Sequence, residues 1–171
     1  MQRELAYRSG YVLQLPGYAL VISYLYLKDF LPEPNQMLIS AYLFLALGVL
    51  ISGVFLKVRS LVVRPFILAA SLTGLVILIA GIAQGSEWTM TLGLAFSLAG
   101  AAGLAGKEAN CFNLMEGWLL LPAYLSLAGV SVWSQWSGQP ILTDKLIWIA
   151  CFVLCLSLTL RKLAKPVPRT A

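Results

Sequence analysis

The densest group of polar side chains in the sequence lies between residues 106 and 118, in an otherwise apolar chain. It includes a thiol, Cys111, which could act as a nucleophile or a redox sensor in its thiolate form. Such a thiol is usually activated by a neighbouring base, but the sequence contains no histidine. The sequence therefore predicts a non-enzymatic protein. The candidate functional residues of this stretch are Lys107, Glu108, Asn110, Cys111, Phe112, Glu116 and Trp118.

Helix capping explains part of the same stretch. Asn113 followed by Glu116 matches an N-cap with an acidic residue in the first helical turn. Lys107 would end the preceding helix, where a cation faces the negative end of the helix dipole. Residues 108–111 would then form a short loop that capping does not explain. The sequence leaves open whether this loop is functional or only connects two capped helices.

Long apolar runs must position these residues. Apolar residues make up 60% of the 171 residues and charged residues 11%, and the mean hydropathy is +0.84. A soluble domain carries about 25% charged residues. About 20 apolar residues span a bilayer, and the backbone there must bond to itself, so these runs should be helices. The sequence predicts an all-α polytopic membrane bundle, a single integral domain over 1–171, with transmembrane helices at about 11–27, 37–56, 66–84, 89–106, 114–133 and 141–160.

The distribution of lysine and arginine predicts the orientation of this bundle. With six helices, ten basic residues fall on one side: Arg3, Arg8, Lys57, Arg59, Arg64, Lys107, Arg161, Lys162, Lys165 and Arg169. The other side carries Lys28 and Lys145. The positive-inside rule then places both termini on the cytoplasmic side. Because the net charge of +5 comes from these separate clusters, the sequence predicts no nucleic-acid partner.

The helix interiors carry weaker signals. In the fourth run Gly93, Ser97 and Ala101 recur every four residues, and Gly103 adds more flat surface. Small residues at this spacing let helices approach closely, so we expect this helix to be central. Helix centres lack the charged residues that ion-coupled transporters usually keep. Prolines in the first and fifth runs indicate either interfacial bends or broken-helix elements of a ligand pocket: Pro16 and Pro122.

Cofactor ligands are scarce. Without histidine, the usual ligand of metal and haem sites is missing. Cys151 and Cys155 lie one turn apart in an apolar run, where we expect small packing residues. We predict no metal or cofactor, and bound lipid is the expected ligand. A pigment has little support, because its only available ligands besides water are Gln14, Gln84, Asn113 and Glu116.

One motif resembles a known family. Lys107-Glu108-Ala109-x-Cys111-Phe112, followed by Glu116-x-Trp118, is similar to a Lys-Glu-Ala-Phe-Cys-Phe signature of domain-of-unknown-function family 2301. This chain has Asn110 where the signature has an aromatic residue. That family comprises integral membrane proteins of cyanobacteria and other bacteria and has no settled activity, so it supplies no catalytic residues. The resemblance implies a bacterial inner membrane or thylakoid membrane, and association with photosynthetic complexes.

Three functions fit these observations. Apolar helices without central charge and short connectors favour a non-enzymatic accessory subunit or assembly factor, with the lipid bilayer and other membrane subunits as partners. The alternative is a small-solute transporter or channel that uses the proline-containing helices as broken elements. A membrane enzyme acting on lipid or quinone through Glu108, Cys111 and Glu116 is the third, which the lack of histidine disfavours.

Overall fold

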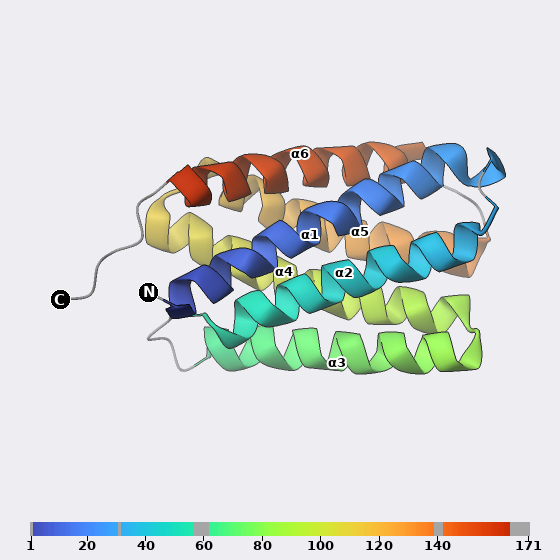
Figure 1. Ribbon diagram of the computed structural model, residues 1–171, viewed down its shortest axis with the longest axis horizontal. Helices are drawn as coiled ribbons and strands as arrows, with labels where there is room; N and C mark the ends of the chain where they lie inside the picture. The colour runs from blue at the N-terminus through green and yellow to red at the C-terminus, as the bar shows by residue number, and fades with distance from the viewer. Residues whose placement is uncertain (1, 31, 57–61, 139–141, 165–171) are drawn as a thin grey trace.

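Six long helices make up nearly all of the described part of the molecule (Figure 1). The computed structural model describes residues 2–30, 32–56, 62–138 and 142–164. All six helices are long and apolar enough to cross a membrane, and the described residues contain no strand. The predicted all-α membrane bundle is therefore confirmed. The elements are α1 (Gln2–Leu27), the 3-10 helix η1 (Lys28–Phe30), α2 (Pro34–Val54), α3 (Val63–Gln84), α4 (Glu87–Phe112), α5 (Met115–Ser137) and α6 (Leu142–Ala164).

One end of the bundle gathers most of the described basic residues, and we call it the basic end. The start of α1 and the end of α6 lie there, together with the end of α4 and the start of α5 (Figure 1). Lys28 and Lys145 belong to segments at the opposite end. The described basic residues of the basic end are Arg3, Arg8, Arg64, Lys107, Arg161 and Lys162, whereas Lys57, Arg59, Lys165 and Arg169 lie outside the described residues.

Several helices reach further at the basic end than their apolar runs predict. α1 begins at Gln2 rather than near 11, and α4 continues to Phe112 rather than ending near 106. α6 continues to Ala164 rather than ending near 160. A run of apolar residues marks only the part of a helix that lies in the hydrocarbon layer. The helix itself continues for as long as its backbone hydrogen bonds and side-chain contacts stabilise it. The predicted loop over residues 108–111 is therefore wrong, because these residues form the last turns of α4.

The connection between α4 and α5 also differs from the prediction. Asn113 ends α4 in the left-handed conformation, with φ 50° and ψ 43°. The N-cap of α5 is Leu114, which makes no side-chain cap bond. The predicted N-cap role of Asn113 is therefore wrong. Asparagine tolerates the left-handed region better than most residues, so it serves here as the C-terminal cap of the preceding helix.

Three helix pairs pack at close backbone distance through glycine. A Cβ added to Gly10 of α1 would lie 2.5 Å from the carbonyl oxygen of Gly48 in α2. A Cβ on Gly93 of α4 would lie 2.5 Å from the amide nitrogen of Leu78 in α3. In α5, Gly117 meets the backbone of α4 in the same way. Small residues therefore supply these interfaces with the close packing that holds helices together in lipid.

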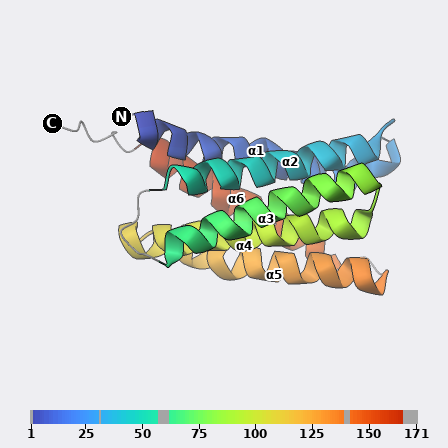
Figure 2. The same cartoon turned by 90° about the horizontal axis from the view of Figure 1, so that it is seen from below.

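α4 is the central helix, as predicted. It packs against α2, α3 and α5, and Figure 2 shows it running between α3 and α5. In its most apolar stretch 61% of the residues are buried, compared with 28% to 39% in the other five helices. The predicted packing residues contribute to this burial: Gly93, Ser97 and Gly103 face α3, and Ala101 lies in the core.

The prolines do not interrupt their helices. α1 continues through Pro16, and α5 continues through Pro122. Gln14, two residues before Pro16 in the helix, is 1% exposed, and its amide nitrogen donates to the carbonyl of Gly10 at 3.3 Å. This amide therefore bonds within its own helix, and its side chain packs against Gly48 of α2. The observed packing gives the ligand-pocket interpretation of this region no support.

Candidate functional site

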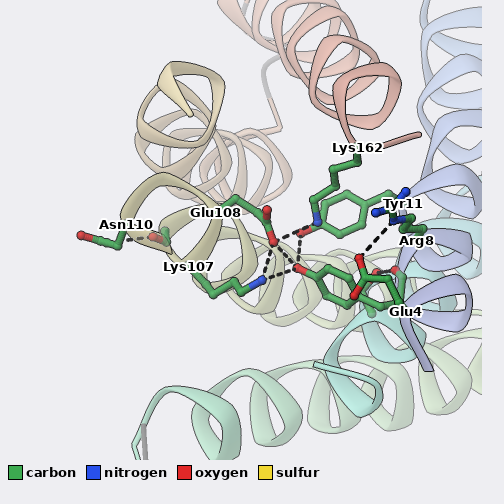
Figure 3. Close-up of polar contacts among 10 residues, drawn as sticks. Glu4, Arg8, Tyr11, Lys107, Glu108, Asn110 and Lys162 are labelled. Carbon is green, nitrogen blue, oxygen red and sulfur yellow. Dashed lines mark hydrogen bonds and ion pairs between the residues drawn. The ribbon is translucent and has the colours of Figure 1, made fainter. Parts of the chain in front are cut away.

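Three helices bring charged and phenolic side chains together inside the basic end (Figure 3). Glu108 of α4 is 0% exposed, and its Oε1 atom lies 2.9 Å from Lys107 Nζ and 2.9 Å from Lys162 Nζ of α6. The same oxygen accepts a hydrogen bond from the hydroxyl of Tyr7 in α1. With Tyr11, which lies one turn further along α1, these residues form what we call the inner cluster: Tyr7, Tyr11, Lys107, Glu108 and Lys162.

The two tyrosines hold the lysine of α6. Their hydroxyl oxygens are 3.2 Å apart, and their rings meet edge to face with centroids 5.5 Å apart. Lys162 Nζ lies 4.0 Å from the ring centroid of Tyr7 and 3.8 Å from that of Tyr11. An ammonium over an aromatic face is attracted by the ring quadrupole, more strongly where water is excluded. Lys162 is therefore fixed between a carboxylate of α4 and two rings of α1.

The inner cluster is a buried electrostatic contact. Burying a charge is costly unless it is paired and hydrogen-bonded, and here one carboxylate serves two ammonium groups. The second carboxylate oxygen, Glu108 Oε2, is buried and has no hydrogen-bond partner among the described residues. Replacing one member of a buried ion pair leaves the other charge unpaired. This loss destabilises a protein by much more than the intact pair stabilises it. The cluster therefore fixes the positions of α1, α4 and α6 relative to one another.

Glu116 belongs to a second polar contact, between α5 and α6. Its Oε1 atom lies 2.8 Å from Arg161 Nε and accepts a hydrogen bond from the Ser157 hydroxyl at 3.1 Å. The side chain of Glu116 is 9% exposed, whereas that of Arg161 is 59% exposed. Glu116 thus ties the start of α5 to α6 instead of forming the predicted capping pair.

The other predicted site residues lie outside the inner cluster. Asn110 donates from Nδ2 to the carbonyl of Gly106 at 2.8 Å, and Cys111 is exposed. Both line an apolar groove of about 640 Å³ between α3, α4 and α5. Trp118 is exposed on α5, and Phe112 ends α4 with a side chain that lies outside the described part of the structure. The predicted polar stretch is therefore divided between a buried cluster, an ion pair and a groove.

Sequence reasoning missed three members of the inner cluster. Tyr7 lies before the predicted start of the first helix, and Lys162 lies after the predicted end of the sixth, where it counted only toward orientation. The i, i+4 spacing of Tyr7 and Tyr11 was a visible signal, because it places two phenols on one helix face. No local pattern, however, indicates that they meet Glu108, which is 101 residues from Tyr7 in the chain.

The three cysteines differ in burial. Cys151 and Cys155 are 0% exposed and belong to the core, as expected for packing residues. Cys111 is exposed on the groove, whereas Glu108, the nearest carboxylate in the sequence, is turned into the inner cluster. Within the described ranges, no group of three histidine, cysteine or acidic side chains is arranged to hold a metal ion. What the arrangement does provide is a fixed, internally paired contact between helices.

Comparisons with protein-family models, with curated proteins and with solved structures find no match to this chain. The resemblance of residues 107–118 to domain-of-unknown-function family 2301 therefore stays a prediction. A proposal about function has to be argued from the packing and the charges of this bundle.

Proposed function

We propose that the protein is a non-enzymatic accessory subunit or assembly factor that packs against a larger membrane protein through the outward face of α5. The observation that carries this proposal is the environment of one glycine. Gly129 lies inside α5, is exposed, and has no atom of the described residues within 4 Å of the place where a Cβ would be. Every other helical glycine would bring its Cβ within 3.2 Å of a neighbour: Gly10, Gly17, Gly48, Gly53, Gly74, Gly81, Gly93, Gly100, Gly103, Gly106 and Gly117.

A glycine inside a helix needs a compensating contact. It is destabilising by about 0.5–1 kcal/mol relative to alanine, because it loses more conformational freedom on folding. The other helical glycines are compensated by close approach between helices within the chain. The two remaining glycines, Gly85 and Gly138, are helix C-caps with positive φ, where glycine is favoured. Among the described residues, nothing gives Gly129 either reason, and a helix from another subunit would supply one.

Neighbouring residues give the same face of α5 the character of a helix interface. Pro122, Ser126, Gly129 and Trp133 are all exposed, and their spacing places them on one side of the helix. We call this set the α5 face. Glycine lets a second backbone approach closely, and a serine hydroxyl can form a hydrogen bond across a helix pair. This composition supports a partner helix in contact with the α5 face.

The inner cluster supports a structural role for the charged residues. Its ammonium groups are engaged by Glu108 and the tyrosine rings, so the cluster serves to hold this bundle together. The middles of the helices carry no charged residue of the kind that coupled transporters keep near the midplane. The alternative of a small-solute transporter therefore has no specific observation in its favour.

The resemblance of residues 107–118 gives the proposal a setting. It favours a bacterial inner membrane or a thylakoid membrane, with a photosynthetic complex as the larger partner. Six membrane-spanning helices agree with either membrane. The partner itself is defined here only by its chemistry, as a membrane protein with an exposed helix that accepts the α5 face.

Affinity purification from native membranes in mild detergent tests the proposal. Wild type, Gly129→Leu and the matched control Ala19→Leu are compared, because Ala19 is also exposed but lies on α1. We expect the wild type and Ala19→Leu to retain a larger membrane protein and Gly129→Leu to lose it, with similar thermal stability for all three. A wild-type protein that purifies only as a homo-oligomer would contradict the proposal, as would full retention of the partner by Gly129→Leu.

A further inference from the structure

The two oxygens of the Glu108 carboxylate have unequal surroundings, and the contacts drawn in Figure 3 all reach one of them. Oε1 lies 2.9 Å from the ammonium groups of Lys107 and Lys162 and accepts a hydrogen bond from Tyr7. Oε2 is buried and accepts no hydrogen bond from the described residues. An ionised carboxylate has about four lone-pair sites, shared between its two oxygens. Three groups therefore contact one oxygen, while the other is left without a donor among the described residues.

Lys162 has an unmet requirement of the opposite kind. Its ammonium carries three N–H donors. Nζ forms the ion pair with Oε1 and lies over the rings of Tyr7 and Tyr11, but it is not aligned for a hydrogen bond with any of the described residues. The side chain is 9% exposed, so bulk solvent reaches it poorly. Leaving buried donors and acceptors without hydrogen bonds destabilises a fold, and native structures rarely do so.

The unmet acceptor and the unmet donors lie close together. The two oxygens of a carboxylate are bonded to the same carbon atom, so Oε2 is near the ammonium that lies 2.9 Å from Oε1. Two hydrogen bonds of about 2.8 Å each, meeting at one small molecule, span such a separation. That molecule has to donate a hydrogen bond to Oε2 and accept one from Nζ at the same time.

These requirements select the ligand. A monatomic anion accepts hydrogen bonds but has none to donate to Oε2. A metal cation would be repelled by the two ammonium groups that already lie 2.9 Å from Oε1. Water donates and accepts, and a buried water typically makes about three hydrogen bonds to polar groups that otherwise lack them. We infer that the inner cluster binds an internal water molecule, which donates to Glu108 Oε2 and accepts from Lys162 Nζ.

The bound water distinguishes the attachment of α6 from the glycine interfaces. A Cβ on Gly93 would lie 2.5 Å from the backbone of α3, so no water fits between those helices at that point. In the inner cluster, the water completes the solvation of a carboxylate and an ammonium that the fold removes from bulk solvent. The site is formed by α1, α4 and α6, and it depends neither on the α5 face nor on a partner protein.

Hydroxyl-radical labelling of the protein in lipid nanodiscs tests the inference, because X-ray radiolysis of an internal water produces radicals beside it. Tyr11 of the inner cluster and Tyr124 of the core are a matched pair, since each is 3% exposed. We expect Tyr11 to be oxidised severalfold faster than Tyr124 at the same dose. Equal rates in the wild type would overturn the inference.

Lys162→Arg provides the control for this measurement. The planar guanidinium keeps the positive charge and donates to both oxygens of one carboxylate at once, so it replaces the water. We expect the oxidation rate of Tyr11 in this variant to fall to that of Tyr124. Ala19→Leu, on an exposed position of α1, should keep the wild-type rate. Melting curves in detergent establish that both variants are folded, and an unchanged rate for Tyr11 in folded Lys162→Arg would contradict the inference.

A crystal structure of the wild type that resolves ordered water gives a second test, which needs no variant. We expect a density peak within hydrogen-bond distance of both Glu108 Oε2 and Lys162 Nζ. An ammonium bonded directly to both carboxylate oxygens, with no peak between them, would show a dry contact and overturn the inference.

Discussion

α6 is attached to the bundle in a different way from the helices that pack through glycine. Where α3 meets α4, Gly74 and Gly93 leave no room for even one added carbon. α6 contains no glycine, and its contacts with neighbouring helices include large or charged side chains such as Trp148 and Lys162. In lipid, the hydrophobic effect does not drive helices together. The glycine interfaces rely on close packing instead, and the α6 interface relies on buried charge. Adding a carbon atom should therefore destabilise a glycine interface, and removing a charge should destabilise the α6 interface.

The largest effect should follow from removing the central carboxylate. Glu108→Gln leaves Lys107 and Lys162 buried without their counter-ion, and breaking a buried pair in this way is destabilising by about 3–5 kcal/mol. The free energy of unfolding in mixed micelles measures this change. Glu4→Gln is the control, because its ion pair with Arg8 is partly exposed and should contribute less than about 1 kcal/mol. Equal effects of the two substitutions would mean that the inner cluster does not hold α6.

An intermediate effect is expected from adding one methyl group to the packed interface. Gly93→Ala places a Cβ 2.5 Å from the backbone of Leu78, which cannot rotate away, and overpacking of this kind is destabilising by about 1–3 kcal/mol. The same change at Gly129 meets open space, so it should stabilise the isolated protein by about 0.5–1 kcal/mol. Unfolding of the two purified variants measures both values. Changes of the same sign would contradict the distinction between these glycines.

The smallest effect should come from the ion pair of α6 whose cation is exposed. Arg161→Gln removes a side chain that is 59% exposed, while Ser157 still donates to Glu116, so we expect less than about 1 kcal/mol of destabilisation. Unfolding at low and high salt should show this small difference shrinking as the salt rises. An effect as large as that of Glu108→Gln would show that burial does not distinguish the two charge contacts of α6.

The number of helices could be predicted from the sequence, because the bilayer demands long apolar helices. The helix ends at the basic end could not. Lys107 and Glu108 interrupt the apolar run, yet α4 continues past them because Glu108 pairs with Lys107 and with Lys162 of α6 and accepts a hydrogen bond from α1. Asn113 was misassigned because the same residue type serves as an N-cap and as a left-handed C-cap.

The candidate site could be predicted only in part. Lys107 and Glu108 stood out as polar residues in an apolar chain, whereas Lys162 looked like one more charge at the end of the last helix. The roles of the glycines could not be predicted from the sequence either. Gly93 and Gly129 are both glycines in apolar helices, and only the positions of neighbouring helices show that one is packed and the other open. The two glycines differ in their tertiary contacts, which no local sequence pattern indicates.

The central claim is that the α5 face contacts another membrane protein, and photocrosslinking in native membranes tests it most directly. A photoreactive amino acid is placed at Ser126, which leaves Gly129 intact, and as a control at Val76, which is 58% exposed on α3. We predict that position 126 forms a crosslink to a protein other than this chain, and that position 76 gives only lipid adducts. Lipid adducts alone at position 126, or crosslinks only to a second copy of this chain, would contradict the claim.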